Sequence, residues 1–168
     1  MKRYRTYLIA ICLLIISNCL TAQDTTAWQH SVLIDTIAPA FSVVDVEGNK
    51  WDSETLRGKT VIINFWSIGC KGCIIELPQL NKFADSLSGD TNLVFLSFLL
   101  DGGQKAQEFL KTHPVSYHVI INTFAEYSKF QINCFPSHLI IDSKGYIRYN
   151  ECDIMDKQRL NDVINKYR

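Results

Sequence analysis

Residues 60–83 read T-V-I-I-N-F-W-S-I-G-C-K-G-C-I-I-E-L-P-Q-L-N-K-F, and they combine a strand pattern, a pair of cysteines and a helix pattern. It begins with a β-branched, apolar run typical of a buried strand, and it ends with apolar residues spaced by three and four, which indicate a helix. Cys70 and Cys73 lie between the two, so we expect the first cysteine at the helix N-terminus. Unpaired backbone N–H groups and the helix dipole favour a thiolate there. The stretch therefore predicts a redox dithiol with Cys70 as nucleophile and Cys73 as resolving thiol.

The pattern N-F-W-x-x-x-C-x-x-C-x-x-E-x-P resembles the active-site motif of the TlpA/ResA group of extracytoplasmic thiol–disulfide oxidoreductases, in the thioredoxin-like (redoxin/AhpC-TSA) superfamily. A second stretch, A-P-A-F-S-V-V-D-V-E-G-N-K followed by L-R-G-K-T-V-I-I-N-F-W, resembles the start of these domains. The resemblance runs from about Ile37 to the C-terminus. It implies a thioredoxin-like α/β fold, with a mixed central β-sheet flanked by helices and an N-terminal β-hairpin extension.

The remaining residue patterns predict the same architecture. We expect a hairpin at 41–51, strands at 93–100 and 117–121, helices at 104–112 and 124–130, and a hairpin that turns at Ser143-Lys144. The apolar stripe of Leu160, Val163, Ile164 and Tyr167 predicts an amphipathic C-terminal helix. Strands that alternate with helices and end in a hairpin predict an α/β sandwich around a mixed sheet.

The first 22 residues have the layout of a secretory signal peptide, with a basic head, an apolar run at 7–16 and a polar end. We expect cleavage after Ala22. The alternative is a lipoprotein signal in which Cys19 carries a lipid anchor. Both predict an exported protein of the periplasm or cell envelope, with a lead-in segment at 23–36 and one thioredoxin-like domain at 37–168.

The charge and cysteine content narrow the choice of partners. The chain has 17 basic and 17 acidic residues, and loss of residues 1–22 would remove three basic and no acidic ones, for a formal charge of −3. No basic run remains, so we expect no nucleic-acid partner. Four of the six cysteines would be exported to a place where disulfides persist.

Two of those four cysteines, Cys134 and Cys152, form either a second disulfide near the dithiol or two separate thiols. If the last hairpin turns at Ser143-Lys144, Cys152 lies opposite Pro136 and close to Cys134. The second pair would then be structural or would relay electrons.

Two further residues are candidate catalytic groups. By resemblance to the thioredoxin fold, Pro136 is a cis proline facing the disulfide, and a cis bond would expose the backbone of Phe135 to an extended substrate segment. Glu76 follows Cys73 by three residues, and a partly desolvated carboxyl there could move protons for the resolving thiol, as the resemblance also implies. Asn64 stands where thioredoxins carry a buried Asp, which favours Glu76 as base. The alternative is a surface glutamate that complements the helix dipole.

We expect the substrate groove to be formed by Trp66, Gly69, Lys71, Gly72 and Phe135. Lys71 adds positive charge beside the thiolate. Gly72 replaces the proline typical of thioredoxins, so the turn should be less rigid. Gly69 replaces a tryptophan that often precedes the first cysteine in the TlpA/ResA group, which uncovers that side of the nucleophile.

The resemblance implies an enzyme of the protein-disulfide reductase type that acts on protein thiols and disulfides, apocytochrome c being one candidate. A membrane electron-donor protein would recharge it, and no metal or organic cofactor is implied. The main alternative is a copper- or metal-binding chaperone using Cys70, Cys73 and His138, although such chaperones typically space their cysteines by three residues. A peroxiredoxin would need a proline and a threonine where Ile63 and Ser67 stand. A third alternative is a redox domain used for binding only.

Overall fold

The computed structural model describes residues 33–87 and 89–167. The predicted signal peptide, the lipid-anchor candidate Cys19 and residues 23–32 of the lead-in segment lie outside the described residues. Within the described part of the chain, no helix is both long and apolar enough to cross a membrane. The last lead-in residues contact the domain, because the Asp35 N–H donates to the carbonyl of Ile147 at 2.8 Å.

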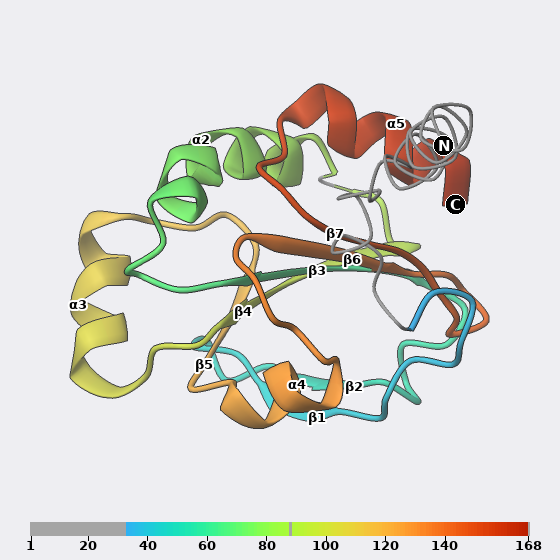
Figure 1. Ribbon diagram of the computed structural model, residues 1–168, viewed down its shortest axis with the longest axis horizontal. Helices are drawn as coiled ribbons and strands as arrows, with labels where there is room; N and C mark the ends of the chain where they lie inside the picture. The colour runs from blue at the N-terminus through green and yellow to red at the C-terminus, as the bar shows by residue number, and fades with distance from the viewer. Residues whose placement is uncertain (1–32, 88, 168) are drawn as a thin grey trace, which may run out of the picture.

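A five-stranded mixed sheet forms the centre of the molecule, in the order β5-β4-β3-β6-β7 (Figure 1). Its strands are β3 (Thr60–Trp66), β4 (Leu93–Leu99), β5 (His118–Ile121), β6 (Ser137–Ile141) and β7 (Ile147–Cys152). The first three run parallel, whereas β6 is antiparallel to both β3 and β7. Every residue of β3 and β4 is buried, as expected of central strands covered on both faces.

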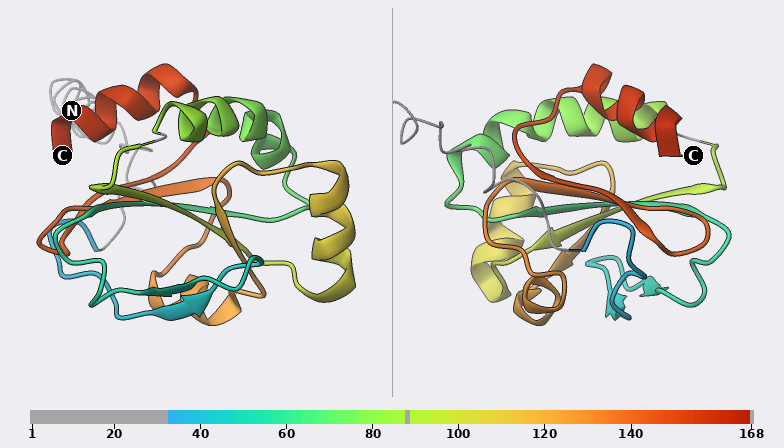
Figure 2. Two further views of the ribbon diagram at one scale, coloured as in Figure 1. Left: turned by 180° about the vertical axis from the view of Figure 1, so that it is seen from behind. Right: turned by 45° about the vertical axis from the view of Figure 1, so that its right-hand side comes forward.

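The helices and a small hairpin cover the two faces of this sheet (Figures 1 and 2). On one face lie α2 (Lys71–Ser86) and α5 (Lys157–Tyr167), and on the other lie α4 (Phe124–Lys129) and the hairpin of β1 (Ser42–Val44) and β2 (Lys50–Asp52). The helix α3 (Gly103–Thr112) stands beside the sheet. This arrangement confirms the predicted α/β class, with its mixed sheet and N-terminal hairpin.

The alternation of side chains along β3 decides what lies under α2. Ile63 and Phe65 pack into the core on the hairpin face, and Ile62 packs under α2 and α5. Since successive strand residues point to opposite faces, Asn64 and Trp66 face α2 together with Ile62. The strand therefore places one polar and one large aromatic side chain beneath the helix that begins at the dithiol.

The last hairpin differs from its predicted register by one residue. Cys152 pairs with Ser137 rather than with Pro136, because the ladder shifts between Ile140 and Ile141. The shift is a bulge on β7, which inserts one extra residue and bends the strand. Cys134 and Cys152 are nevertheless joined in a disulfide, with their Cα atoms 6.0 Å apart.

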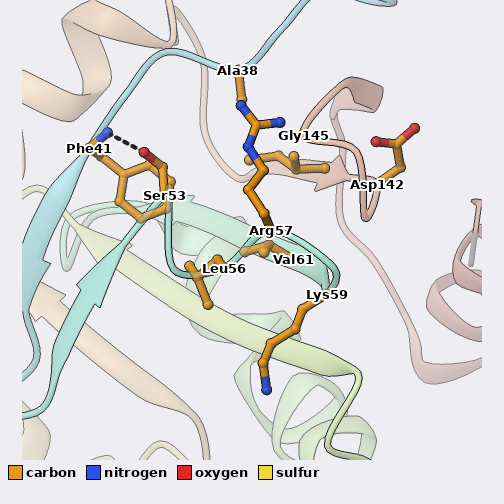
Figure 3. A pocket seen from close by; sticks show the side chains of 10 residues that line it. Ala38, Phe41, Ser53, Leu56, Arg57, Lys59, Val61, Asp142 and Gly145 are labelled. Carbon is orange, nitrogen blue, oxygen red and sulfur yellow. Dashed lines mark hydrogen bonds between the residues drawn. The ribbon is translucent and has the colours of Figure 1, made fainter.

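A small pocket at the start of β3, lined by Val61, lies away from the dithiol, which follows the end of that strand (Figure 3). Arg57 extends across it and donates to the carbonyl of Lys144. The Phe41 N–H donates to the Ser53 hydroxyl at 3.2 Å. The first contact joins the segment after β2 to the turn between β6 and β7, and the second closes the base of the β1–β2 hairpin, so the pocket serves packing rather than the dithiol.

Candidate active site

The dithiol lies where the strand–turn–helix pattern predicts it. Cys70 is the N-cap of α2, and its sulfur accepts a hydrogen bond from the Cys73 N–H at 3.1 Å. The two cysteines form a disulfide with Cα atoms 5.3 Å apart. Cys70 is half-buried, whereas Cys73 is only 1% exposed. A substrate can therefore reach Cys70 first, and a thiolate there gains from the Cys73 N–H and the helix dipole.

The turn between β3 and α2 is held by a carboxylate from the end of β4. Asp101 Oδ2 accepts the Ile68 N–H at 2.8 Å, and its other oxygen pairs with Lys105. Partial burial by itself raises the pKa of Asp101, but the hydrogen bonds from Lys105 and Ile68 outweigh it and lower that pKa. Sequence reasoning missed Asp101 because only a strand break was visible there.

The Phe135–Pro136 peptide bond is cis, which is the geometry expected from the resemblance. Pro136 is buried, and the half-buried ring of Phe135 packs edge-on against Tyr127 with centroids 5.0 Å apart. The Tyr127 hydroxyl donates to the carbonyls of Trp66 and Phe98, so this ring is fixed to the ends of the central strands. Phe135 is thereby held in one orientation beside the proline.

The predicted groove residues Gly69, Lys71 and Gly72 differ in their surroundings. Gly69 and Lys71 are exposed, and a Cβ on Gly69 would meet no atom within 4 Å. A Cβ on Gly72 would lie 3.4 Å from Pro136 Cδ and 3.3 Å from Ile154 Cγ1. Ile154 is 44% exposed. It was missed because it comes from the segment after β7, and only the fold brings it to the dithiol.

The prediction that Trp66 lines the groove is wrong. Its side chain has no exposed surface, and its ring N–H donates to the Ser97 hydroxyl at 2.6 Å. It packs with Cys73 and Leu77 under the start of α2. Trp66 therefore packs beneath the dithiol as a core residue. Its position along β3 points its side chain toward the helix rather than toward solvent.

Glu76 is buried rather than on the surface, with 1% of its area exposed. Its Oε1 accepts a hydrogen bond from Asn64 Nδ2 at 3.2 Å. Its Oε2 accepts the Met155 N–H at 3.0 Å and lies 3.1 Å from His138 Nε2. Such a set of donors is what a buried carboxylate requires. The surface alternative for Glu76 is therefore wrong, and its burial is deeper than the partial desolvation that we expected.

His138 does not adopt the role that the metal-chaperone alternative requires. It lies opposite Asn64 in the β3–β6 ladder, and its Nε2 contacts the carboxylate of Glu76. Over the described ranges, ligand atoms of three His, Cys, Asp or Glu residues gather within 4.8 Å of one another only at Asp45, Glu47 and His118. That group contains neither cysteine of the dithiol, so the predicted metal set is not brought together.

Comparisons with known proteins agree with the geometry. A family model described as the AhpC/TSA family matches residues 34–150. Thiol-disulfide oxidoreductase ResA of Bacillus cereus is 26% identical over 171 residues, covering 99% of this chain and 98% of the relative. Thioredoxin-like protein YneN of Bacillus subtilis is 24% identical over 130 residues, covering 76% of each chain.

Solved structures resemble this chain in fold. The crystal structure of StoA from Bacillus subtilis has a TM-score of 0.67 at 21% identity and covers 75% of this chain and 96% of its own. A thiol:disulfide interchange protein of the thioredoxin family from Chlorobium tepidum has a TM-score of 0.68 at 23% identity, with coverages of 79% and 96%. At these identities the similarity establishes the thioredoxin-like fold.

Proposed function

Because this chain belongs to the AhpC/TSA family and is a thiol–disulfide oxidoreductase, we propose that it reduces disulfides in protein substrates through Cys70 and Cys73. The observation that carries the proposal is the placement of this disulfide. Its first sulfur is at the N-cap of α2, and Gly72, between the two cysteines, lies beside the cis Pro136.

The reaction is two successive exchanges. The Cys70 thiolate attacks a substrate disulfide, so that a Cys70–substrate bond forms and one substrate sulfur leaves as a thiolate. The Cys73 thiolate then attacks the Cys70 sulfur, which closes the Cys70–Cys73 disulfide and releases the second substrate thiolate. The substrate gains two electrons and the protein loses two, so an external reductant must restore the dithiol.

Glu76 is the base that we assign to the second exchange. It lies on the same helix as Cys73, three residues away, and residues at this spacing are neighbours on a helix surface. Cys73 is almost fully buried, so water is poorly placed to take its proton. Its carboxyl oxygens accept hydrogen bonds from Asn64 and from the Met155 N–H, which hold the group in place beneath α2.

The substrate segment would lie in the groove beside Phe135 and Pro136. As the resemblance to the thioredoxin fold implies, an extended chain would pair there with the backbone before the proline as an added strand. Gly69 leaves the approach to Cys70 open, and the exposed Lys71 adds positive charge there. Ile154 forms the opposite wall through its proximity to Gly72.

We further propose that the protein is exported and works in the periplasm or cell envelope, either cleaved after Ala22 or anchored through Cys19. Residues 1–22 support this by their signal-peptide layout, and the two disulfides suit an oxidising compartment. In such a compartment a membrane electron-donor protein is the expected source of electrons, and apocytochrome c is one candidate substrate.

A trapping experiment tests the proposal. A Cys73→Ser variant should stop after the first exchange and accumulate a mixed disulfide between Cys70 and a reporter such as insulin. The matched Cys70→Ser variant should accumulate none. Equal trapping by both variants, or no acceleration of insulin reduction by the reduced wild-type protein, would contradict the proposed function.

A further inference from the structure

A buried polar cluster, defined here as Asn64, Glu76 and His138, lies between the sheet and α2. Its members come from β3, α2 and β6, and none is more than 1% exposed. The carboxylate is at the centre, since Asn64 and His138 each contact a different oxygen of Glu76. The cluster occupies the sheet face under the helix that carries Cys73.

Two members of this cluster each have one polar side-chain atom without a hydrogen-bond partner. Over residues 33–87 and 89–167, the buried side-chain atoms without a hydrogen-bond partner are Asn64 Oδ1, His138 Nδ1 and the Tyr117 hydroxyl. Buried polar atoms are normally paired, so exceptions that concentrate around one carboxyl group call for an explanation. A group that changes its protonation state needs neighbours that can both donate and accept. Side-chain amides have this property, and so do imidazoles.

The contacts at Oε2 of Glu76 favour one state of the His138 ring. A proton on Nδ1 would be a buried donor without an acceptor, so the geometry favours a neutral ring with its hydrogen on Nε2. The ring then donates to Oε2, as does the Met155 N–H. Two donors directed at Oε2 leave Oε1 as the oxygen that receives an incoming proton. Asn64 contacts Oε1, and rotation of its amide would present Oδ1 as the acceptor.

We infer that His138 is a positioning residue for the resolving step: it occupies Oε2 of Glu76 and thereby directs the proton of Cys73 to Oε1. The inference rests on the proposed function and deepens it. In this step the Cys73 S–H bond breaks, the proton moves to Oε1, and the sulfur electron pair attacks the Cys70 sulfur. The Cys70–substrate bond breaks and the substrate leaves as a thiolate, which takes up a proton from Glu76 or from solvent.

The other charged and titratable groups near the cluster are less suited than Glu76 to exchange a proton with Cys73. Burial, and secondly the charge of Glu76, raises the pKa of the Tyr117 phenol, so this group stays neutral. Asp153 lies in the segment before α5, and its hydrogen bond with Arg159 is the largest cause that lowers its pKa. Arg159 also pairs with Glu151, so this network has one cation and two carboxylates, and because it is exposed, solvent ions screen its remaining charge. Among these groups, Glu76 is the one suited to exchange a proton with Cys73.

The test is the pH dependence of the exchange rate with a protein disulfide. His138→Leu removes a donor to the carboxylate, so the midpoint of the rate profile should rise by about one pH unit and the rate below it should fall about tenfold. His138→Gln places an amide N–H near the same oxygen and should restore most of the wild-type profile. In a Glu76→Gln background, His138→Leu should produce no further shift, since the two residues act as one unit.

His118→Leu is the matched control. His118 also contacts a carboxylate, with Nδ1 3.1 Å from Asp45 Oδ2, but on the hairpin. The His118→Leu variant should leave the midpoint of the rate–pH profile unchanged. If His138→Leu does not fold, His138→Asn, whose amide is too short to reach Oε2, should give the same shift.

Two results would overturn the inference while leaving the proposed function intact. One is a folded His138→Leu variant whose rate–pH profile has the same midpoint as wild type. The other is a shift of that midpoint by His138→Leu that persists in the Glu76→Gln background. Failure of the wild-type protein itself to exchange disulfides would instead overturn the proposed function.

Discussion

The two disulfides of this protein lie close to the same cis proline, yet they constrain the chain in different ways. Cys70 and Cys73 are three residues apart, so their bond closes a small ring at the start of one helix. Cys134 and Cys152 are 18 residues apart, and their bond joins the approach to Pro136 to the end of β7. A disulfide stabilises mainly by restricting the unfolded chain, and more so for longer loops. We therefore expect the Cys70–Cys73 bond to take part in disulfide exchange and the Cys134–Cys152 bond to stabilise the fold.

The surroundings of the sulfurs agree with this division. Cys70 accepts a backbone N–H at a helix N-terminus, and the buried carboxylate of Glu76 lies one turn after Cys73 on the same helix. Cys134 instead contacts the Ser137 hydroxyl at 3.7 Å. Cys134 precedes Pro136 by two residues and Cys152 precedes Ile154 by two, so the second disulfide fixes both segments that flank Gly72. The two disulfides therefore differ in that only the Cys70–Cys73 pair lies at a helix N-terminus and on the helix of Glu76, which we propose as its base.

The largest expected effect is the loss of exchange in Cys70→Ser. Without the nucleophile, reduction of insulin by the protein should fall by about a thousandfold or more, which corresponds to at least ~4 kcal/mol of barrier. Its free energy of unfolding should fall by less than on loss of the Cys134–Cys152 bond, because a four-residue ring restricts the unfolded chain less than a longer loop does. Retained activity would show that a different cysteine carries the chemistry.

The next effect is a loss of stability in the double variant Cys134→Ser/Cys152→Ser. Opening this loop should lower the free energy of unfolding by about 3 kcal/mol, as measured by denaturant titration. Exchange of insulin should stay within about threefold of wild type under conditions where the variant is folded. If the double variant lost exchange as completely as Cys70→Ser, the two disulfides would not have separate roles.

A stability effect independent of both disulfides comes from Asp45 in the hairpin segment. Burial by itself raises the pKa of Asp45, but hydrogen bonds from Asn49, Trp51 and the backbone of Glu47 outweigh it and lower that pKa to about 2. A depressed pKa contributes stability above the unfolded value near 3.9, and this is lost as the pH falls toward 2.

Asp45→Asn tests this contribution. The variant should lose on the order of 2 kcal/mol at neutral pH and show a flatter stability profile between pH 4 and 2. Unfolding midpoints measured across that range provide the check. A variant as acid-sensitive as wild type would assign the loss to other carboxylates, and the exchange rate at neutral pH should be unaffected in either case.

The smallest expected effect is on the groove. In Gly72→Ala the new Cβ would press on Ile154, which can shift, so exchange with a protein disulfide should slow by about threefold. Exchange with a small disulfide such as oxidised glutathione should not change. Gly69→Ala is the matched control, because its Cβ would meet open space. Equal slowing with both substrates would mean that the substitution disturbs the dithiol itself.

The sequence predicts those parts of the site whose residues lie close together along the chain at recognisable spacings. Cys70, Cys73 and the helix after them follow from residues 60–83, and the cis geometry of Pro136 followed from the resemblance that this motif supports. The contact between Glu76 and His138 joins residues 62 apart and depends on strand register. The position of Cys152 was wrong by one residue because a bulge is not visible as a pattern. The contacts of Met155 with Glu76 and of Ile154 with Gly72 could not be predicted either, because they depend on where the chain turns after that bulge.

The most direct test of the two-role account is a redox titration that follows both cysteine pairs in the same sample. The protein would be equilibrated in thiol buffers of defined potential, alkylated, and analysed by mass spectrometry for each pair separately. We predict a reversible Cys70–Cys73 midpoint near thioredoxin's, roughly −270 mV, while Cys134–Cys152 stays oxidised to below about −300 mV. A Cys70–Cys73 midpoint near −120 mV would contradict the reductant role. The absence of any reversible midpoint at Cys70–Cys73, or a reversible one at Cys134–Cys152 instead, would contradict the account as a whole.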